Sequence, residues 1–178
     1  MTMRIGFVLP SSDYLFDPFR GDPFTHFQIL TVLEDFFGNQ ITVSLIDLRG
    51  VEKEFAGYHI PECDIYLHSV YTLDFEEQSA IIQVLRQRYP KAIHIAGGPH
   101  ANIFPELTLK IADALIVGEG EETVIQAIRD FRELKLQRIY EERKPLDINR
   151  YPHWRRNFLP EGAVARRIPV PRWRRRAL

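Results

Sequence analysis

The sequence has one cysteine, Cys63, and no apolar run approaching the roughly 18 residues that a transmembrane helix requires. A single cysteine excludes an intrachain disulfide and any metal site built only from cysteines. The N-terminus enters a strand-like pattern almost at once and lacks the apolar core of a signal peptide. No HExxH, Walker or Ser-His-Asp pattern is present. We therefore expect a cytoplasmic protein with no membrane segment.

Positive charge is scarce over most of the chain and concentrated at its end. Residues 1–149 contain 14 Lys and Arg against 23 Asp and Glu, whereas residues 150–178 contain nine Arg, no Lys and one acid. An acidic body argues against nucleic-acid binding by that body. We interpret residues 155–178 as an Arg-rich irregular tail. It could bind nucleic acid or a membrane surface, but we favour a shifted reading frame, because the composition changes abruptly after Trp154.

Strand-like and helical patterns alternate along the remaining sequence. The expected strands are residues 4–9, 41–47, 64–70, 92–96 and 114–117. The expected helices are residues 25–37, 74–89, 104–111 and 123–134. Such alternation predicts an α/β fold with right-handed crossovers. We expect a flavodoxin-like, doubly wound parallel sheet of five strands in the order 2-1-3-4-5, with helices on both faces.

Two glycine-bearing turns follow the last two expected strands. The first is Ala-Gly-Gly-Pro-His-Ala-Asn at 96–102, and the second is Gly-Glu-Gly-Glu-Glu-Thr at 118–123. Open α/β sheets bind ligands at the carboxyl edge of their strands, where both turns would lie. Glycine allows a bulky ligand to approach the backbone closely. The turns therefore predict a binding site at this edge.

Several candidate residues also have a structural interpretation. Gly97 and Gly98 could simply form a tight turn, and His100 could hydrogen-bond within the protein instead of contacting the ligand. Ser69 could cap a turn at the end of the third strand. His68 should point to the opposite face from Ser69 and pack in the core. The candidate ligand-binding residues are Ser69, Thr72, Gly97, Gly98, Pro99, His100, Gly118, Glu119 and Gly120.

These turns and the Pro-Leu-Asp-Ile-Asn-Arg-Tyr-Pro segment at 145–152 carry a family resemblance. Residues 4–152 resemble the N-terminal cobalamin-binding domain of cobalamin-dependent radical S-adenosylmethionine proteins. The resemblance implies cobalamin as the cofactor, held at the carboxyl edge of the sheet. It also implies a domain at residues 1–140 and a linker at 141–154 that would lead to a radical S-adenosylmethionine barrel, a possible partner.

The sequence departs from this family in two ways. The barrel motif CxxxCxxC binds an iron–sulfur cluster through three thiolates, and this chain has only Cys63. We therefore expect a cobalamin-binding module that is not catalytic alone, with the cluster and S-adenosylmethionine found only in a full-length relative. The Asp-x-His-x-x-Gly motif that presents histidine to cobalt is also absent, and His26 has the wrong spacing to replace it. The alternative is an orphan flavodoxin-like interaction or regulatory domain that binds no corrin.

Overall fold

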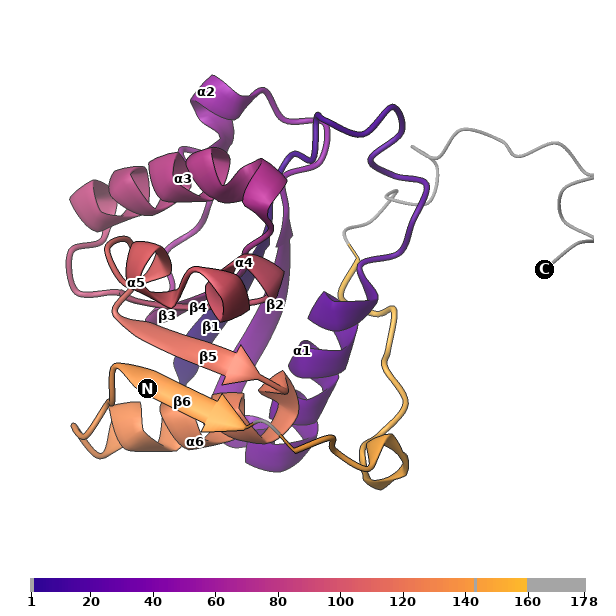
Figure 1. Cartoon of the computed structure of the whole chain (residues 1–178), viewed down its shortest axis with the longest axis vertical. Helices are drawn as coiled ribbons and strands as arrows, with labels where there is room; N and C mark the ends of the chain where they lie inside the picture. Colours follow the sequence, from indigo (N-terminus) through magenta and orange to yellow (C-terminus); the bar gives the residue numbers. More distant parts are fainter. Residues whose placement is uncertain (1, 143, 160–178) are drawn as a thin grey trace, which may run out of the picture.

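The protein forms a single parallel sheet flanked by helices, in a computed structural model that describes residues 2–142 and 144–159 (Figure 1). The strands are β1 (Met3–Leu9), β2 (Ile41–Asp47), β3 (Ile65–Ser69), β4 (Ile93–Gly97), β5 (Ala114–Gly118) and β6 (Ile139–Glu142). The helices are α1 (Phe24–Phe37), α2 (Lys53–Ala56), α3 (Phe75–Arg88), α4 (Pro99–Ile103), α5 (Pro105–Thr108) and α6 (Gly120–Arg132). Short 3₁₀ turns occur at Gly38–Gln40, Thr72–Asp74 and Ile148–Arg150.

The sheet has six strands in the order β2-β1-β3-β4-β5-β6, and every neighbouring pair is parallel. The expected α/β fold and the order of the first five strands are therefore confirmed, but the expected strand number of five was wrong. The additional strand β6 is short and lies at the sheet edge, where only Tyr140 is buried. So short an edge strand has too few buried positions to show a clear alternating pattern.

The two faces of the sheet are covered by different helices (Figure 1). On one face, Phe7, Leu67 and Ile116 pack with side chains from α1 and α6 in the larger hydrophobic cluster. On the other face, Val8 and Tyr66 pack with α3, and Ala96 and Leu115 pack near α4. Successive residues of a strand point to opposite faces, which explains why neighbouring residues join different clusters. Helices therefore lie on both faces, as expected.

Helix boundaries differ from the expected ones where glycine or proline begins the helix. Helix α6 begins at Gly120 rather than Thr123. The helix expected over residues 104–111 is shorter, Pro105–Thr108, and a separate short helix that was not expected precedes it at Pro99–Ile103; a proline begins each. Proline fits the first turn of a helix, where its missing N–H has no partner to lose. Both changes place α-helical turns directly after the carboxyl ends of β4 and β5.

The segment after β6 returns to pack against the first helix. In Figure 1 this orange-to-yellow segment leaves β6 and runs beside α1. The domain boundary that we predict at residue 140 falls inside β6, and Trp154 and Phe158 pack against the α1 side of the core. None of the helices in the described ranges is long and apolar enough to cross a membrane. Residues 160–178, most of the predicted Arg-rich tail, lie outside the described residues.

Candidate functional site

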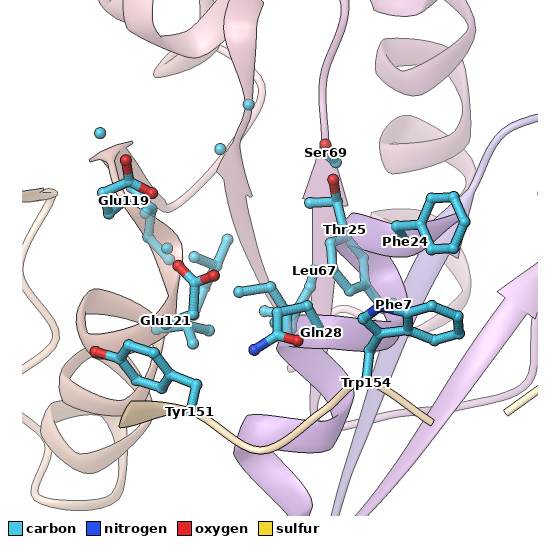
Figure 2. A pocket seen from close by; sticks show the side chains of 18 of the residues that line it. Phe7, Phe24, Thr25, Gln28, Leu67, Ser69, Glu119, Glu121, Tyr151 and Trp154 are labelled. Atoms are coloured by element: carbon cyan, nitrogen blue, oxygen red, sulfur yellow. The ribbon is translucent and has the colours of Figure 1, made fainter. Parts of the chain in front are cut away.

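A pocket of about 660 Å³ lies over the face of the sheet that α1 and α6 cover. This volume is within the range of small-molecule sites, roughly 300–1,000 Å³. Its sides come from the first turns of α1 and α6 and from the segment after β6 (Figure 2). Strands β1, β3, β4 and β5 supply its floor through Phe7, Leu67, Ile95 and Ile116. The pocket therefore extends inward from the carboxyl edge, between two helices.

The floor of the pocket is apolar, and its polar groups lie toward the strand ends and the helices. Phe7, Leu67 and Ile95 are at most 5 % exposed. Figure 2 shows Gln28 of α1 between the two sides of the pocket, with Ser69 at the tip of its strand. Glu121 and Tyr151 lie on one side, opposite Phe24 and Trp154. An apolar floor with a few polar groups favours a ligand with a flat, apolar part and a polar remainder.

The first glycine turn brings backbone close to backbone at the pocket edge. Gly98 has a φ of 96° and a ψ of −178°, a conformation that is essentially restricted to glycine. A Cβ atom on Gly98 would lie 2.9 Å from the Val70 amide nitrogen and 3.1 Å from the Ser69 hydroxyl oxygen. The Val70 amide donates to the Gly97 carbonyl at 2.8 Å, and the His100 amide donates to the Val70 carbonyl at 3.0 Å. The backbone conformation and the close contact with Val70 therefore require glycine at position 98, whether or not a ligand binds there.

Six of the nine predicted site residues line this pocket. They are Ser69, Gly97, Gly98, Gly118, Glu119 and Gly120. The two glycine turns are directly joined, because the Gly118 amide donates to the Asn102 side-chain oxygen at 3.0 Å. Neighbouring strand ends therefore bring together residues that are about 50 positions apart in the sequence. Their contact with a ligand stays a prediction.

The other three, Thr72, Pro99 and His100, lie beside the pocket without lining it. His100 is 4 % exposed, and its ring stacks on Phe75 and lies tilted against Phe104. The Nδ1 atom of His100 lies 3.1 Å from the Thr72 hydroxyl oxygen. Desolvation lowers the pKa of His100, which favours the neutral ring. In this geometry His100 and Thr72 connect α4 to the loop after β3, and their role in ligand binding stays a prediction.

Two residue groups of the pocket were missed by the sequence analysis. Thr25, Gln28 and Ile29 come from the first turns of α1, which no turn motif marks. Tyr151 and Trp154 come from the segment that we interpreted as a linker. The only sequence signal for the second group was the presence of two aromatic residues, Tyr151 and Trp154, because no local pattern shows that the chain returns to α1.

The remaining histidines of the sheet region are part of the core. His26, which lacks the spacing of a cobalt ligand, is 5 % exposed, and its ring lies tilted against Phe7 with the ring centroids 4.1 Å apart. Its Nε2 atom lies 3.3 Å from the Val8 carbonyl, and burial lowers its pKa to about 4. His68 contacts Gln78 and His94 on the opposite face of the sheet. This arrangement agrees with the packing role expected for His68, although the residue also borders the pocket.

Among the residues that the structure describes, no cluster of three or more His, Cys, Asp or Glu side chains could hold a metal ion. Burial raises the pKa of the Cys63 thiol to about 11, so it is protonated at neutral pH. The thiolate is the reactive and metal-binding form of cysteine. The Cys63 thiol, which does not line the pocket, is therefore in its less reactive form.

The fold and the pocket define a small-molecule-binding α/β domain, and comparison with known families defines it further. Residues 25–128 match the model of the B12 binding domain, so this chain belongs to that family. The resemblance to a cobalamin-binding domain, predicted from the two glycine turns, is confirmed.

The curated relative that matches is a much longer protein. It is 2-(S-pantetheinyl)-carbapenam-3-carboxylate methyltransferase of Streptantibioticus cattleyicolor, 32 % identical over 103 residues. The match covers 56 % of this chain and 14 % of that protein. The chain therefore spans a small part of its relative's length.

Two solved structures share the fold. The cobalamin-dependent S-adenosylmethionine radical enzyme OxsB, solved with aqua-cobalamin bound, has a TM-score of 0.58 at 17 % identity. This match covers 76 % of the chain and 19 % of OxsB. The isolated REC domain of RcsB from Salmonella enterica serovar Typhimurium has a TM-score of 0.52 at 11 % identity, covering 84 % of this chain and 97 % of that domain. At these identities the likeness shows the flavodoxin-like architecture alone.

Proposed function

We propose that this chain binds cobalamin, as the cofactor-binding module of a cobalamin-dependent radical S-adenosylmethionine protein. Family membership and the pocket at the expected edge of the sheet support the proposal. Both the curated relative and OxsB are longer than this chain, which agrees with a module that works beside a catalytic domain. The radical chemistry would belong to that domain.

The pocket would hold the nucleotide tail of cobalamin, which ends in a flat aromatic base. The apolar floor formed by Phe7, Leu67 and Ile95 suits the base, since burying apolar surface stabilises the complex by about 25 cal/mol per Å². The Ser69 hydroxyl and the Gln28 amide can hydrogen-bond to the ribose and phosphate. The corrin ring would then lie over the glycine turns, where side chains are small. The apolar floor of the pocket is the main structural observation in support of the proposal.

The residues of this chain bind and orient the cofactor. Cobalamin supplies cobalt-centred group transfer when it is bound, and the protein supplies position and surroundings. Gly98 keeps the loop after β3 against α4, and the Asn102 side chain joins the two glycine turns. A preorganised edge of this kind loses little conformational freedom when the ligand binds.

The test is retention of hydroxocobalamin by the purified chain. After incubation and desalting, we expect visible corrin absorbance to remain with the protein and the thermal midpoint to rise. Ligand at 100 times its Kd stabilises the folded state by about 2.7 kcal/mol. Colourless protein with an unchanged midpoint would favour the alternative, a flavodoxin-like interaction domain that binds no corrin.

A matched pair of glycine variants tests the location of the site. A Cβ atom on Gly120 would lie 3.2 Å from the end of the Ile29 side chain, so a larger group there projects between α6 and α1. We expect Gly120→Leu to abolish retention while the protein stays folded. The control is Gly21→Leu, since nothing lies within 4 Å of a Cβ atom on Gly21. Equal retention by the two variants would place the site elsewhere.

A further inference from the structure

One side of the pocket is formed by residues 149–156, which we call the strap. The pocket is lined there by Asn149, Tyr151, Pro152, His153 and Trp154. The strap crosses from α6 to α1 and contacts both helices that border the pocket (Figures 1 and 2). A ligand that fills the pocket must therefore touch the strap.

The strap is attached at both ends by specific contacts. At its start, the Tyr151 hydroxyl donates to a Glu122 carboxylate oxygen of α6 at 2.8 Å. At its end, the Trp154 ring lies 4.9 Å from Phe24 and 6.0 Å from Phe27, both on α1. Together these contacts bridge the opening between the two helices.

The two arginines that follow Trp154 add polar attachments to α1 and to the loop before it. The Arg155 amide donates to the buried Thr31 hydroxyl at 3.0 Å, and its guanidinium pairs with Glu34 at 2.9 Å. The Arg156 guanidinium pairs with Asp22 at 2.7 Å. The Arg155–Glu34 pair is exposed by about two-fifths on both sides, and pairs of this kind contribute little in water. The Asp22 carboxylate is only 4 % exposed, so its pair with Arg156 is the more buried of the two. Part of the polar attachment of the strap is therefore weak in water, so a ligand that contacts the strap can add to its docking.

We propose that the strap is part of the cofactor-binding site and that its docking on α1 is thermodynamically linked to filling of the pocket. This inference rests on the proposed binding of cobalamin. A bound nucleotide tail contacts Pro152 and Trp154 and so holds the strap in place. By reciprocity, the docked strap raises affinity for the ligand by the same factor. Because the chain continues from the strap, occupancy of the pocket fixes the position at which the following segment leaves the domain.

The first test is the affinity of Trp154→Ala for hydroxocobalamin, measured by equilibrium dialysis with visible absorbance. We expect the Kd to rise at least 10-fold. The control is Phe36→Ala, because Phe36 is a 44 % exposed aromatic residue of α1 that does not line the pocket. Its Kd should stay within twofold of the wild-type value. A Trp154→Ala Kd equal to that of the wild type contradicts the proposal.

The second test uses the unmodified protein, so it does not depend on folding of a variant. We expect trypsin to cleave after Arg155 and Arg156 mainly when the strap leaves α1, whereas Lys135 is exposed between α6 and β6 and does not line the pocket. Saturating hydroxocobalamin should slow cleavage at the two arginines at least fivefold and leave cleavage at Lys135 unchanged.

The outcomes separate the two proposals. Retention of hydroxocobalamin without protection at Arg155 and Arg156 overturns the role of the strap and leaves cobalamin binding intact. Failure of the wild-type chain to retain hydroxocobalamin overturns both proposals.

Discussion

Replacing Gly98 by alanine tests whether the first glycine turn holds the pocket edge together. The substitution places a methyl group in a backbone conformation with a φ of 96°, which side chains other than hydrogen rarely adopt. Backbone strain of this kind costs about 1–3 kcal/mol. The new Cβ atom would also lie 2.9 Å from the nitrogen and 3.0 Å from the oxygen of Val70. Those atoms belong to a hydrogen-bonded backbone and cannot move aside alone.

Overpacking typically costs a further 1–3 kcal/mol, so the two effects together should lower the free energy of unfolding by about 3 kcal/mol. For a urea m-value of about 2 kcal/mol/M, the unfolding midpoint falls by about 1.5 M. The same variant should bind hydroxocobalamin more weakly, because Ser69 and Gly97 border the displaced turn. Urea unfolding followed by circular dichroism measures the first effect, and equilibrium dialysis measures the second.

The control is Gly21→Ala, in the loop between β1 and α1. Gly21 has no positive φ, and a Cβ atom there meets nothing within 4 Å. Surface substitutions of this kind change stability by about 0.5 kcal/mol or less. If Gly98→Ala unfolds at the same urea concentration as Gly21→Ala, the close approach of the two loops does not hold in solution.

Two further predictions concern buried charge. Arg49→Ala should lower the free energy of unfolding by about 3–5 kcal/mol, because it leaves the buried Asp47 carboxylate without its ion-pair partner. The control Lys135→Ala, which removes an exposed pair, should not move the urea midpoint. A midpoint loss equal for both variants would contradict this. Burial lowers the pKa of His26 and of His68 from 6.5 to about 4. Below pH 6.5 the unfolded chain therefore binds protons that the folded chain does not. The free energy of unfolding then falls by about 1.4 kcal/mol per pH unit for each histidine as the pH drops from 6.5 toward 4. Asp74, whose pKa burial raises to about 6, opposes this between pH 4 and 6. The urea midpoint of the wild-type protein should therefore decline from pH 7.5 to 4.5, and that of His68→Gln should decline less steeply. The same slope in both proteins would show that His68 does not contribute to the decline.

Much of the fold follows from local sequence patterns. Five strands and the helices between them repeat their apolar residues with the periods of the elements they form, so their order is readable along the chain. The glycine turns are readable too, because Gly98 must adopt a conformation that other residues avoid. Each of these features depends on residues that are close in sequence.

The tertiary structure decided the features that depend on distant residues. Strand β6 is defined by pairing with β5, and its own four residues bury only Tyr140. The sequence around His100 does not show what surrounds its ring, whereas the structure places that ring between Phe75 and Phe104, outside the pocket lining.

The pocket shows the same division. Its glycine edge was determined by the sequence, whereas its second side required Trp154 to meet Phe24 and Arg155 to meet Thr31 across more than 120 positions of chain. Such contacts form because the folded core brings α1 and the strap together and apolar surface is buried between them. The local periodicity of the sequence does not report contacts between distant residues. Only the folded structure could therefore show that the segment interpreted as a linker lines the pocket.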